Sequence, residues 1–218
     1  MRRVAIEPLG DAAVLVRLGI AIDEATHRRV RAAHASLTAE PFPGVSDIVP
    51  AYTTVTLHYD PARVDPEALS RRVRELVEQL PEELALPSRL VRVPVRYGGE
   101  DGPDLAAVAA HAQLSPEEVV RRHAAGEYVV HMIGFAPGFP YLFGLDPQLA
   151  CPRRDAPRQR VPAGSVGIGG TQAGIYPIET PGGWQLIGRT SLVLFDAARE
   201  PPGLLAPGDR VRFEETRA

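Results

Sequence analysis

The fold of the second half of the chain is decided by the stretch Met132–Thr190, MIGFAPGFPYLFGLDPQLACPRRDAPRQRVPAGSVGIGGTQAGIYPIETPGGWQLIGRT. It combines many glycines and prolines with aromatic residues throughout. Glycine allows backbone angles that are closed to other residues, and proline fixes φ. Disordered linkers lack aromatics and β-type runs, such as 166–168 and 184–187 here. We therefore expect ordered loops and short strands that together form a surface.

Further short strands are predicted on both sides of this stretch. The apolar run Tyr128–Ile133 leads into it, and Leu192–Phe195 follows it. A turn at Pro207–Asp209 then precedes a last strand that ends near Phe213. Many short strands separated by turns are typical of a β-barrel.

Two short helices are predicted just before the barrel, over 103–111 and 115–125. Ser115, Pro116 and Glu118 form a capping-box pattern at the start of the second. No basic recognition face follows, so we interpret the helices as a packing pair and not as a DNA-binding helix-turn-helix.

The first part of the chain alternates between strand and helix patterns. The expected order is strand, helix, strand, strand, helix, strand, over residues 12–18, 25–37, 45–50, 53–59, 65–79 and 90–95. This order predicts an α+β fold of the ferredoxin-like, split βαβ type. Because Pro81–Ser88 has the composition of a linker, we expect an N-terminal domain at 1–88 and a β-barrel domain at 89–218.

Composition limits the class of protein. The chain has 218 residues, a net charge of −3 and 44% hydrophobic residues, which is ordinary for a globular protein and argues against nucleic acid as a partner. No apolar run is long enough for a transmembrane helix, and the start has no signal-peptide core. With Cys151 as its one cysteine, the chain is predicted to be cytoplasmic, with no membrane partner.

The sequence contains no lysine, so all 24 basic residues are arginine. This excludes a Schiff-base lysine, a P-loop lysine and a lysine general base within the chain. Every fixed positive charge is a guanidinium, which suits bidentate contacts with carboxylate or phosphate.

Motifs for common catalytic centres are weak. His27 and His34 lie about 10 Å apart along one predicted helix, too far to share a metal, and we expect no metal site. The run 163–167 superficially resembles a nucleophile elbow, but the last histidine, His131, precedes Ser165, so a serine hydrolase of that fold is rejected. Cys151 is expected to be a small buried hydrophobe and not a nucleophile paired with a histidine.

Two features leave alternatives open. The glycine-rich run 164–170 precedes no helix and carries no Lys-Ser/Thr, so a nucleotide loop is disfavoured. With the arginines of 153–160 it forms either a backbone nest for an anion or only a solvated arginine cluster. Arg189 interrupts an apolar run and either points out of the barrel or is held by Glu179 or Asp196.

Four motifs carry a resemblance to a known family. They are Gly134–Leu142, Pro157–Gly167, Gly174–Pro177 and Pro181–Thr190, and they resemble the family of 5-oxoprolinase B subunits. That family is also called KipI, allophanate hydrolase subunit 1 or carboxyltransferase subdomain C/D. The resemblance extends over nearly the whole chain, with one mild departure at Ala173, where the family is expected to have threonine.

The resemblance implies a fold and an activity. The fold is an α+β N-terminal domain followed by a cyclophilin-like β-barrel. The activity is ATP-dependent hydrolysis of 5-oxo-L-proline to L-glutamate, carried out with the partner A and C subunits, and with ATP bound in the assembled complex. The chain would then be a non-autonomous hydrolase subunit whose catalytic residues are unknown. Some members instead inhibit a sporulation sensor histidine kinase, which is the alternative function.

One shared surface is predicted to bind the substrate or a partner. Its side chains are aromatic, proline, glutamine and arginine residues on glycine- and proline-fixed loops, and arginine and aromatic side chains often anchor interfaces. They are Phe135, Pro137, Phe139, Arg158, Gln172, Tyr176, Trp184 and Arg189. The alternative is that Tyr176 and Trp184 fill the barrel interior, because aromatics also dominate cores.

Overall fold

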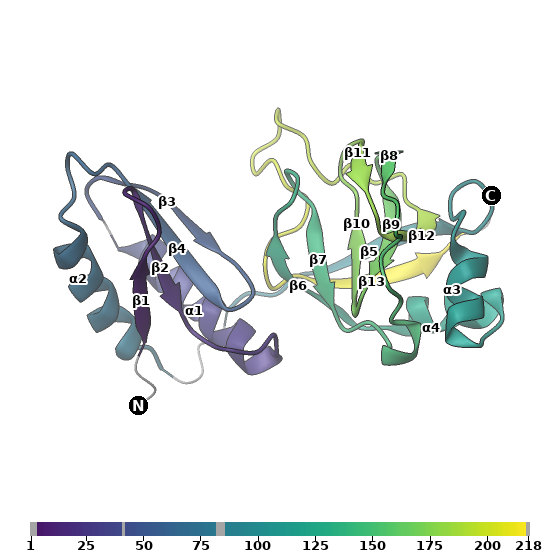
Figure 1. The fold of residues 1–218 in the computed structure, drawn as a ribbon, viewed down its shortest axis with the longest axis horizontal. Helices are drawn as coiled ribbons and strands as arrows, with labels where there is room; N and C mark the ends of the chain where they lie inside the picture. Colours follow the sequence, from purple (N-terminus) through teal and green to yellow (C-terminus); the bar gives the residue numbers. More distant parts are fainter. Residues whose placement is uncertain (1–3, 41, 82–85, 217–218) are drawn as a thin grey trace. The chain divides into compact units, whose positions relative to one another are not determined.

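The chain forms two compact units, Met1–Pro87 and Ser88–Ala218. The computed structural model describes residues 4–40, 42–81 and 86–216 (Figure 1). Half of the predicted linker, 82–85, lies outside the described residues. Each unit has its own hydrophobic core, so the two units are described separately.

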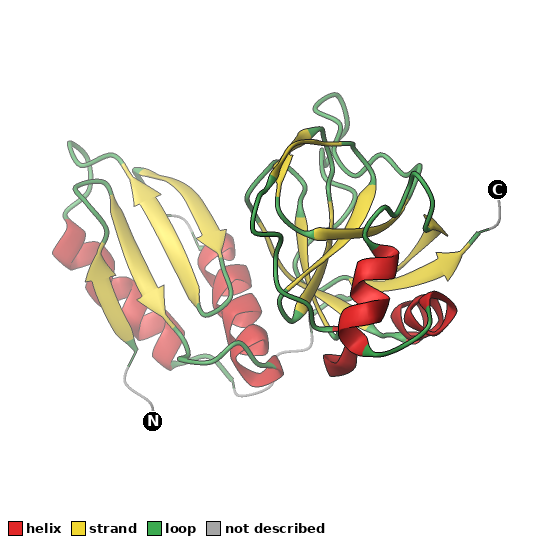
Figure 2. Ribbon diagram, turned by 45° about the vertical axis from the view of Figure 1, so that its right-hand side comes forward, coloured by secondary structure: helices red, strands yellow, loops and turns green. Residues whose placement is uncertain are grey.

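The first unit is a four-stranded antiparallel sheet with two helices on one face (Figure 2). Its elements are β1 (Ala5–Pro8), β2 (Ala13–Arg17), α1 (Glu24–Ala39), β3 (Val45–Pro50), β4 (Thr54–Tyr59) and α2 (Pro66–Glu78). The order in the sheet is β1-β2-β4-β3. Alternate residues of β4, such as Val55 and Leu57, are buried against Leu37 of α1 and Val73 of α2.

Both helices begin at an aspartate that caps the first turn. An oxygen of Asp23 accepts a hydrogen bond from the Thr26 amide at 2.7 Å, and Asp65 accepts one from the Glu67 amide at 3.0 Å. Pro66 occupies the first turn of α2, where its missing N–H costs nothing. The caps satisfy amides that have no partner inside a helix.

The predicted ferredoxin-like arrangement is not confirmed for the first unit. The strand expected to complete its sheet, 90–95, is part of β5 (Leu90–Tyr97) and belongs to the second unit. There it pairs in parallel with β13 (Arg210–Glu215), in register from Leu90 to Val95. The edge position beside β2 is taken by β1, a short and mostly exposed strand whose pattern gave no periodic signal.

The second unit is a closed barrel of seven strands, so the predicted barrel is confirmed. The order around it is β10-β7-β6-β13-β5-β12-β9. Besides β5 and β13, the strands are β6 (Tyr128–Ile133), β7 (Pro140–Phe143), β9 (Ser165–Gly169), β10 (Gln172–Ile175) and β12 (Gln185–Arg189). A separate two-stranded ribbon pairs β8 (Arg158–Val161) with β11 (Thr180–Gly182).

The predicted helix pair lies against this barrel. Helix α3 (Leu105–Ala112) packs on α4 (Pro116–Ala125) and on β12, and α4 also packs on β13. The Ser115 hydroxyl accepts a hydrogen bond from the Glu118 amide at 3.2 Å, as the capping pattern predicts. A short 3-10 helix, η1 (Pro147–Leu149), follows β7.

The strand predicted at Leu192–Phe195 is wrong. Only Phe195 forms a β-bridge, with Gly203, and no strand spans these residues. The Leu194 carbonyl accepts a hydrogen bond from the Leu204 amide, and the Val193 carbonyl accepts one from the Arg199 guanidinium. The local turn thus takes up main-chain groups that a neighbouring strand would need.

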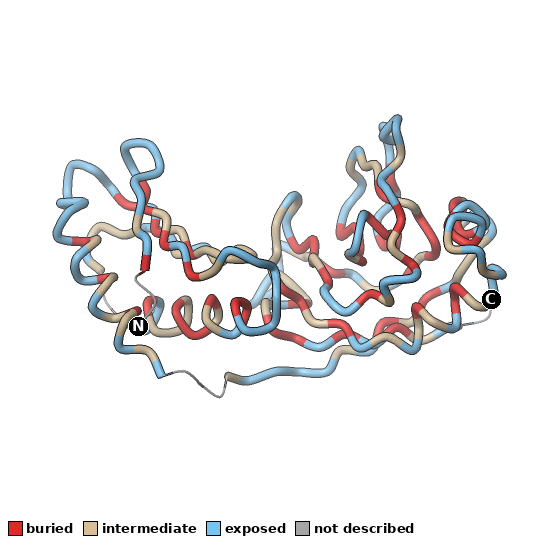
Figure 3. The backbone as a smooth tube through the Cα atoms, turned by 60° about the horizontal axis from the view of Figure 1, so that its bottom comes forward, coloured by how far each residue is buried: buried red, intermediate tan, exposed pale blue. Residues whose placement is uncertain are grey.

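His123 is fully buried inside the barrel unit; Figure 3 marks the buried stretches of both units in red. The ring of His123 lies 4.4 Å from that of Phe213, and its Nδ1 is 2.8 Å from the Tyr97 hydroxyl. Burial lowers the pKa of His123 to about 3, because the charged imidazole would lose its hydration. The side chain is therefore neutral at physiological pH.

This buried histidine should make the barrel unit less stable in mild acid. The native pKa lies below the unfolded value of about 6.5, so only the unfolded state binds the proton between these pH values. As the pH drops below 6.5, the free energy of unfolding should decrease by up to about 1.4 kcal/mol per pH unit. The total loss at pH 5 should be about 2 kcal/mol. Denaturant titrations at pH 7, 6 and 5 measure this loss.

The matched variant is His123→Gln, which keeps an acceptor for the Tyr97 hydroxyl but does not titrate. Carboxylates titrate in both proteins, so the difference between the two slopes isolates His123. Equal slopes in the two proteins would contradict the prediction.

Candidate functional site

The glycine-rich run forms the surface against which the single tryptophan, Trp184, packs. Strand β9 alternates between faces, with Val166 and Ile168 in the barrel core. On the opposite face, a Cβ at Gly169 would lie 2.5 Å from Cε2 of Trp184. A Cβ at Gly167 would lie 3.2 Å from the Trp184 Cβ. The missing side chains thus let the indole lie directly on the strand backbone.

The anion nest considered for this run is wrong. Strand β9 pairs with β10 on one side and with β12 on the other, so its main chain is taken up by the barrel ladders. All five residues of β9 are buried. An anion site must therefore be sought in side chains.

Trp184 belongs to a second hydrophobic cluster, outside the barrel interior. The buried members are Phe139, Val161, Tyr176, Trp184 and Leu186. Neighbouring residues of β12 divide between the two cores, since Leu186 joins this cluster and Ile187 joins the barrel core. Tyr176 and Trp184 are only 1% and 5% exposed. The alternative prediction, that they fill the barrel interior, is nevertheless wrong, because they belong to the second cluster.

The rings of this cluster meet edge to face. The Phe139 ring lies 5.2 Å from Tyr176 and 5.4 Å from Trp184, at interplanar angles of 84° and 87°. Tyr141 lies 5.8 Å from Trp184 at 66°. Aromatic pairs favour such arrangements, which stabilise the cluster. We call this packed cluster the aromatic wall.

A pocket of about 160 Å³ opens beside this wall. It is lined by the rings just described together with Phe135, Pro157, two glycines and two arginines, Arg153 and Arg154. Burial raises the pKa of Tyr176 and of Tyr141, so both phenols are neutral at physiological pH and can donate hydrogen bonds. The pocket thus combines apolar faces with cationic and hydroxyl donors.

A buried carboxylate fixes the arginines. Asp104 is 4% exposed, and its Oδ1 accepts hydrogen bonds from Arg154 Nη1 at 3.0 Å and from Arg158 Nη2 at 2.8 Å. Its other oxygen, Oδ2, accepts the Leu186 amide of β12 at 2.7 Å. One negative charge therefore holds two positive charges on the barrel wall.

Donor capacity is left over in this cluster. Arg154 Nε and Arg158 Nη1 are buried and have no hydrogen-bond partner among the described residues. A buried polar group without a partner costs about 1–3 kcal/mol. Arg153 adds a third positive charge, with its guanidinium carbon 5.8 Å from the centre of the Trp184 ring. The cluster carries more positive than negative charge and is suited to an anion.

Phe135 projects from the same region. Its ring is 62% exposed and lies 5.4 Å from the Phe139 ring. Its φ of 68° places it in the left-handed region, which is uncommon for a bulky residue. The structure therefore holds an exposed aromatic side chain at the edge of the pocket by an unusual backbone conformation.

The structure brings together part of the predicted surface. Phe135, Phe139, Tyr176 and Trp184 line the pocket, and Arg158 lies behind it on Asp104. The other three predicted residues do not line the pocket: Pro137 is exposed in a turn, Gln172 begins β10 and Arg189 ends β12.

Arg189 follows neither of the carboxylate pairings proposed for it. Its Nε donates to the Ala163 carbonyl at 2.9 Å, while Glu179 pairs with Arg160 and Asp196 pairs with Arg199.

Sequence reasoning missed Asp104 as a site residue. It resembled only the start of a helix, and its partner arginines follow 50 and 54 residues later. Arg153 and Arg154 were noted as part of an arginine cluster but were not assigned to the surface. No local spacing signals an ion pair of such long range.

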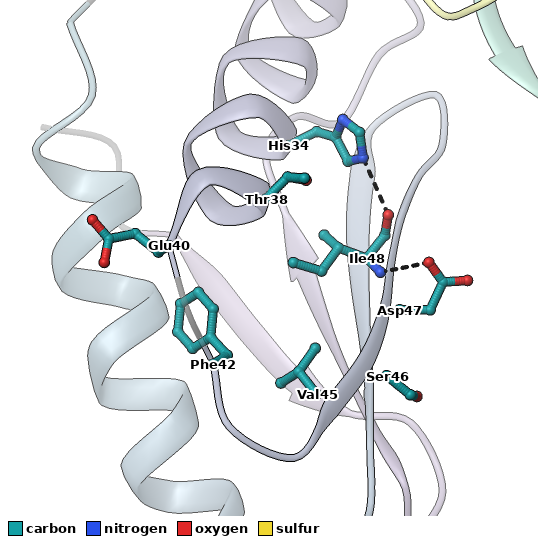
Figure 4. A pocket seen from close by; sticks show the side chains of 8 residues that line it. All are labelled: His34, Thr38, Glu40, Phe42, Val45, Ser46, Asp47 and Ile48. Carbon is teal, nitrogen blue, oxygen red and sulfur yellow. Dashed lines mark hydrogen bonds between the residues drawn. The ribbon is translucent and has the colours of Figure 1, made fainter. Parts of the chain in front are cut away.

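A second pocket, of about 360 Å³, lies in the first unit between α1 and β3 (Figure 4). His34 Nε2 lies 3.1 Å from the Ile48 carbonyl oxygen, and the Ile48 amide donates to Asp47 at 2.8 Å. These contacts cover main-chain groups on β3, an edge strand of its sheet. Edge strands need such protection, and we interpret this pocket as part of the edge.

Other candidate chemistry is limited. Within residues 4–40, 42–81 and 86–216, no group of three or more His, Cys, Asp or Glu side chains is placed to hold a metal. Cys151 packs in the barrel core, and burial raises the pKa of its thiol, as expected for a small buried hydrophobe. No helix in the described part of the chain is long and apolar enough to span a bilayer.

Comparison with known proteins establishes the family. The family described as carboxyltransferase domain, subdomain C and D, matches residues 4–205. The chain belongs to this family. Among family relatives, the 5-oxoprolinase B subunit of Bacillus subtilis (strain 168) is 49% identical over 97% of this chain and 92% of its own length. The corresponding protein of Escherichia coli O157:H7 is 47% identical over 98% of this chain and 96% of its own. The predicted resemblance to the B-subunit family is confirmed.

Solved structures agree with the fold. The protein TTHA0988 matches with a TM-score of 0.83 and 44% identity over 94% of this chain. This chain spans only 40% of the length of TTHA0988. The Kluyveromyces lactis urea amidolyase matches with a TM-score of 0.78, at 21% identity, over 98% of this chain and 15% of its own length, which supports the fold alone.

Proposed function

We propose that this chain is the B subunit of an ATP-dependent 5-oxoprolinase. With the A and C subunits it would hydrolyse 5-oxo-L-proline to L-glutamate, in a reaction that consumes two waters: one opens the lactam bond and the other converts ATP to ADP and phosphate. The observation that carries the proposal is the match, over nearly the full length of both chains, to three relatives named as B subunits of 5-oxoprolinase. Such end-to-end similarity favours the same role in the same kind of assembly.

The proposal extends to the domains and the setting. We treat 1–88 and 89–218 as separate domains, and we assign the barrel to the cyclophilin-like type. ATP is proposed to act in the complete assembly, within the cytoplasm. The bounds of the two compact units support the division.

The partner contact is assigned to the exposed part of the predicted surface. Phe135 and Pro137 are exposed on a loop whose next residue, Gly138, has a φ of 81°. A loop of fixed conformation loses little entropy on binding, and an exposed aromatic is a common interface anchor. We propose that this loop contacts the C subunit.

The test is reconstitution of the purified A, B and C subunits with ATP and 5-oxo-L-proline. Glutamate should form with all three subunits, and omission of this chain should abolish its formation. Phe135→Ala should weaken binding to the C subunit by about tenfold or more, the size expected of an interface anchor. Arg160→Gln, a surface change on the neighbouring ribbon, is the matched control and should bind normally.

Full glutamate production without this chain would overturn the proposal. A chain that is dispensable for turnover but lowers autophosphorylation of a sensor histidine kinase would instead support the inhibitor function.

A further inference from the structure

We infer that the pocket beside Trp184 binds a small monocarboxylate with a compact ring, the class to which 5-oxo-L-proline belongs. The choice of this acid rests on the proposed function. The chemical class rests on the pocket, which is lined by two arginines and by aromatic rings.

The carboxylate end is indicated by Arg154. This residue lines the pocket, and its side chain is 37% exposed, so it can meet a ligand there. Its Nη1 is already held by Asp104, so the guanidinium is oriented before any ligand arrives. Arg153 also lines the pocket and adds a second guanidinium, which is exposed. Oriented guanidinium groups bind carboxylates through strong charge-assisted hydrogen bonds.

The ring end is indicated by the aromatic wall. The Phe139 ring is nearly perpendicular to those of Tyr176 and Trp184, and all three are almost fully buried. These packed rings support the more exposed rings of Phe135 and Tyr141, which also line the pocket and offer an apolar surface to a compact ring. The absence of a side chain at Gly182 makes room for Tyr176 in this wall, because a Cβ there would lie 2.3 Å from the Tyr176 hydroxyl oxygen.

The size of the pocket selects among anions. Its volume of about 160 Å³ is well below the roughly 300 Å³ at which pockets for drug-sized ligands begin. An amino-acid-sized ring fits within this volume. The pocket therefore favours a small acid over a nucleotide.

Arg153 lies at the exposed side of the pocket. It is exposed and has no ion pair with a described carboxylate, while its guanidinium stands near the Trp184 ring. A cation there attracts an anion toward the pocket, where water is partly excluded and electrostatic contacts are stronger. Arg153 therefore contributes to affinity without being needed for the fold.

The sole tryptophan makes the test direct. Purified chain is titrated with 5-oxo-L-proline while Trp184 emission is followed, and calorimetry is run in parallel because it does not depend on emission. A saturable response is expected. The neutral 5-oxo-L-prolinamide should bind about tenfold more weakly or worse, since it lacks the charge that the guanidinium groups recognise.

Variants separate the pocket from general charge. Arg154→Gln should weaken binding by about tenfold or more, and Arg153→Gln by a few fold, since charge-assisted hydrogen bonds are stronger than neutral ones. Arg153→Gln is exposed and keeps the inference testable if Arg154→Gln fails to fold. Arg160→Gln removes the same charge outside the pocket and should bind normally.

Absence of binding by both methods, equal binding of acid and amide, or saturable displacement of the acid by ATP would overturn the inference. The outcome is distinct from that of reconstitution. Turnover that requires the chain, together with no binding by the purified chain, would refute this inference and leave the proposed function intact. Binding of the acid by a chain that contributes nothing to turnover would refute the proposed function and leave this inference intact.

Discussion

Asp104→Ala should destabilise the barrel unit by about 3 kcal/mol, the lower end of the range for breaking a buried ion pair. The carboxylate is buried and accepts three hydrogen bonds, two from arginines and one from the Leu186 amide. Alanine leaves the amide and both guanidinium groups without this partner. Because the Arg154 and Arg158 side chains are 37% and 23% exposed, water offsets part of the loss.

The loss is measured by denaturant titration followed through Trp184 emission, which reports the barrel unit alone. Glu179→Ala is the control, since Glu179 also pairs with an arginine but lies on the surface with its side chain 52% exposed. Exposed ion pairs contribute about 0–1 kcal/mol, so this variant should unfold almost like the wild type. Equal midpoints for the two variants would show that Asp104 does not anchor the wall.

Gly169→Ala should lower the free energy of unfolding by about 2–3 kcal/mol and also disturb the pocket, since overpacking of a tight core costs about 1–3 kcal/mol. The new methyl group would lie 2.5–2.7 Å from three atoms of the Trp184 indole, which must move. The ring can shift only away from β9, so Trp184 emission should change and the response to 5-oxo-L-proline should be weakened or lost.

The neighbouring glycine supplies the control. Gly170 has a φ of 64° and nothing within 4 Å of an added Cβ, so alanine there costs only its backbone preference, about 1–2 kcal/mol. Gly170→Ala should keep the emission spectrum and the ligand response of the wild type. A normal emission spectrum for Gly169→Ala would contradict the prediction that the Trp184 indole packs directly on β9.

Local signals in the sequence predicted much of the fold. The cap at Ser115 lies three residues from the amide that it satisfies, so a short pattern suffices to find it. The barrel was predicted from many short strands. The assignment of 90–95 to the wrong unit has a different cause, because its partner β13 lies some 120 residues later. Pairing at such separation leaves no trace in local periodicity.

The candidate site was predictable in its residue types but not in its arrangement. Aromatic and arginine side chains on rigid loops pointed to the correct region, and four of the eight predicted residues line one pocket. What composition did not show is that Gly167 and Gly169 face Trp184 while Val166 and Ile168 face the barrel. The backbone of these glycines was considered as an anion nest, whereas their missing side chains make room for the Trp184 ring.

The position of β13 in the barrel affects how the chain can fold during synthesis. This strand, Arg210–Glu215, lies between β5 and β6, so the ring of strands stays open until these residues leave the ribosome. The first unit, by contrast, contains all of its strands before residue 60 and can fold while the rest is still being translated. The nascent barrel meanwhile exposes the free edges of β5 and β6, which are competent to pair with other chains. Chaperone binding to ribosome-bound intermediates should therefore be concentrated on the second unit.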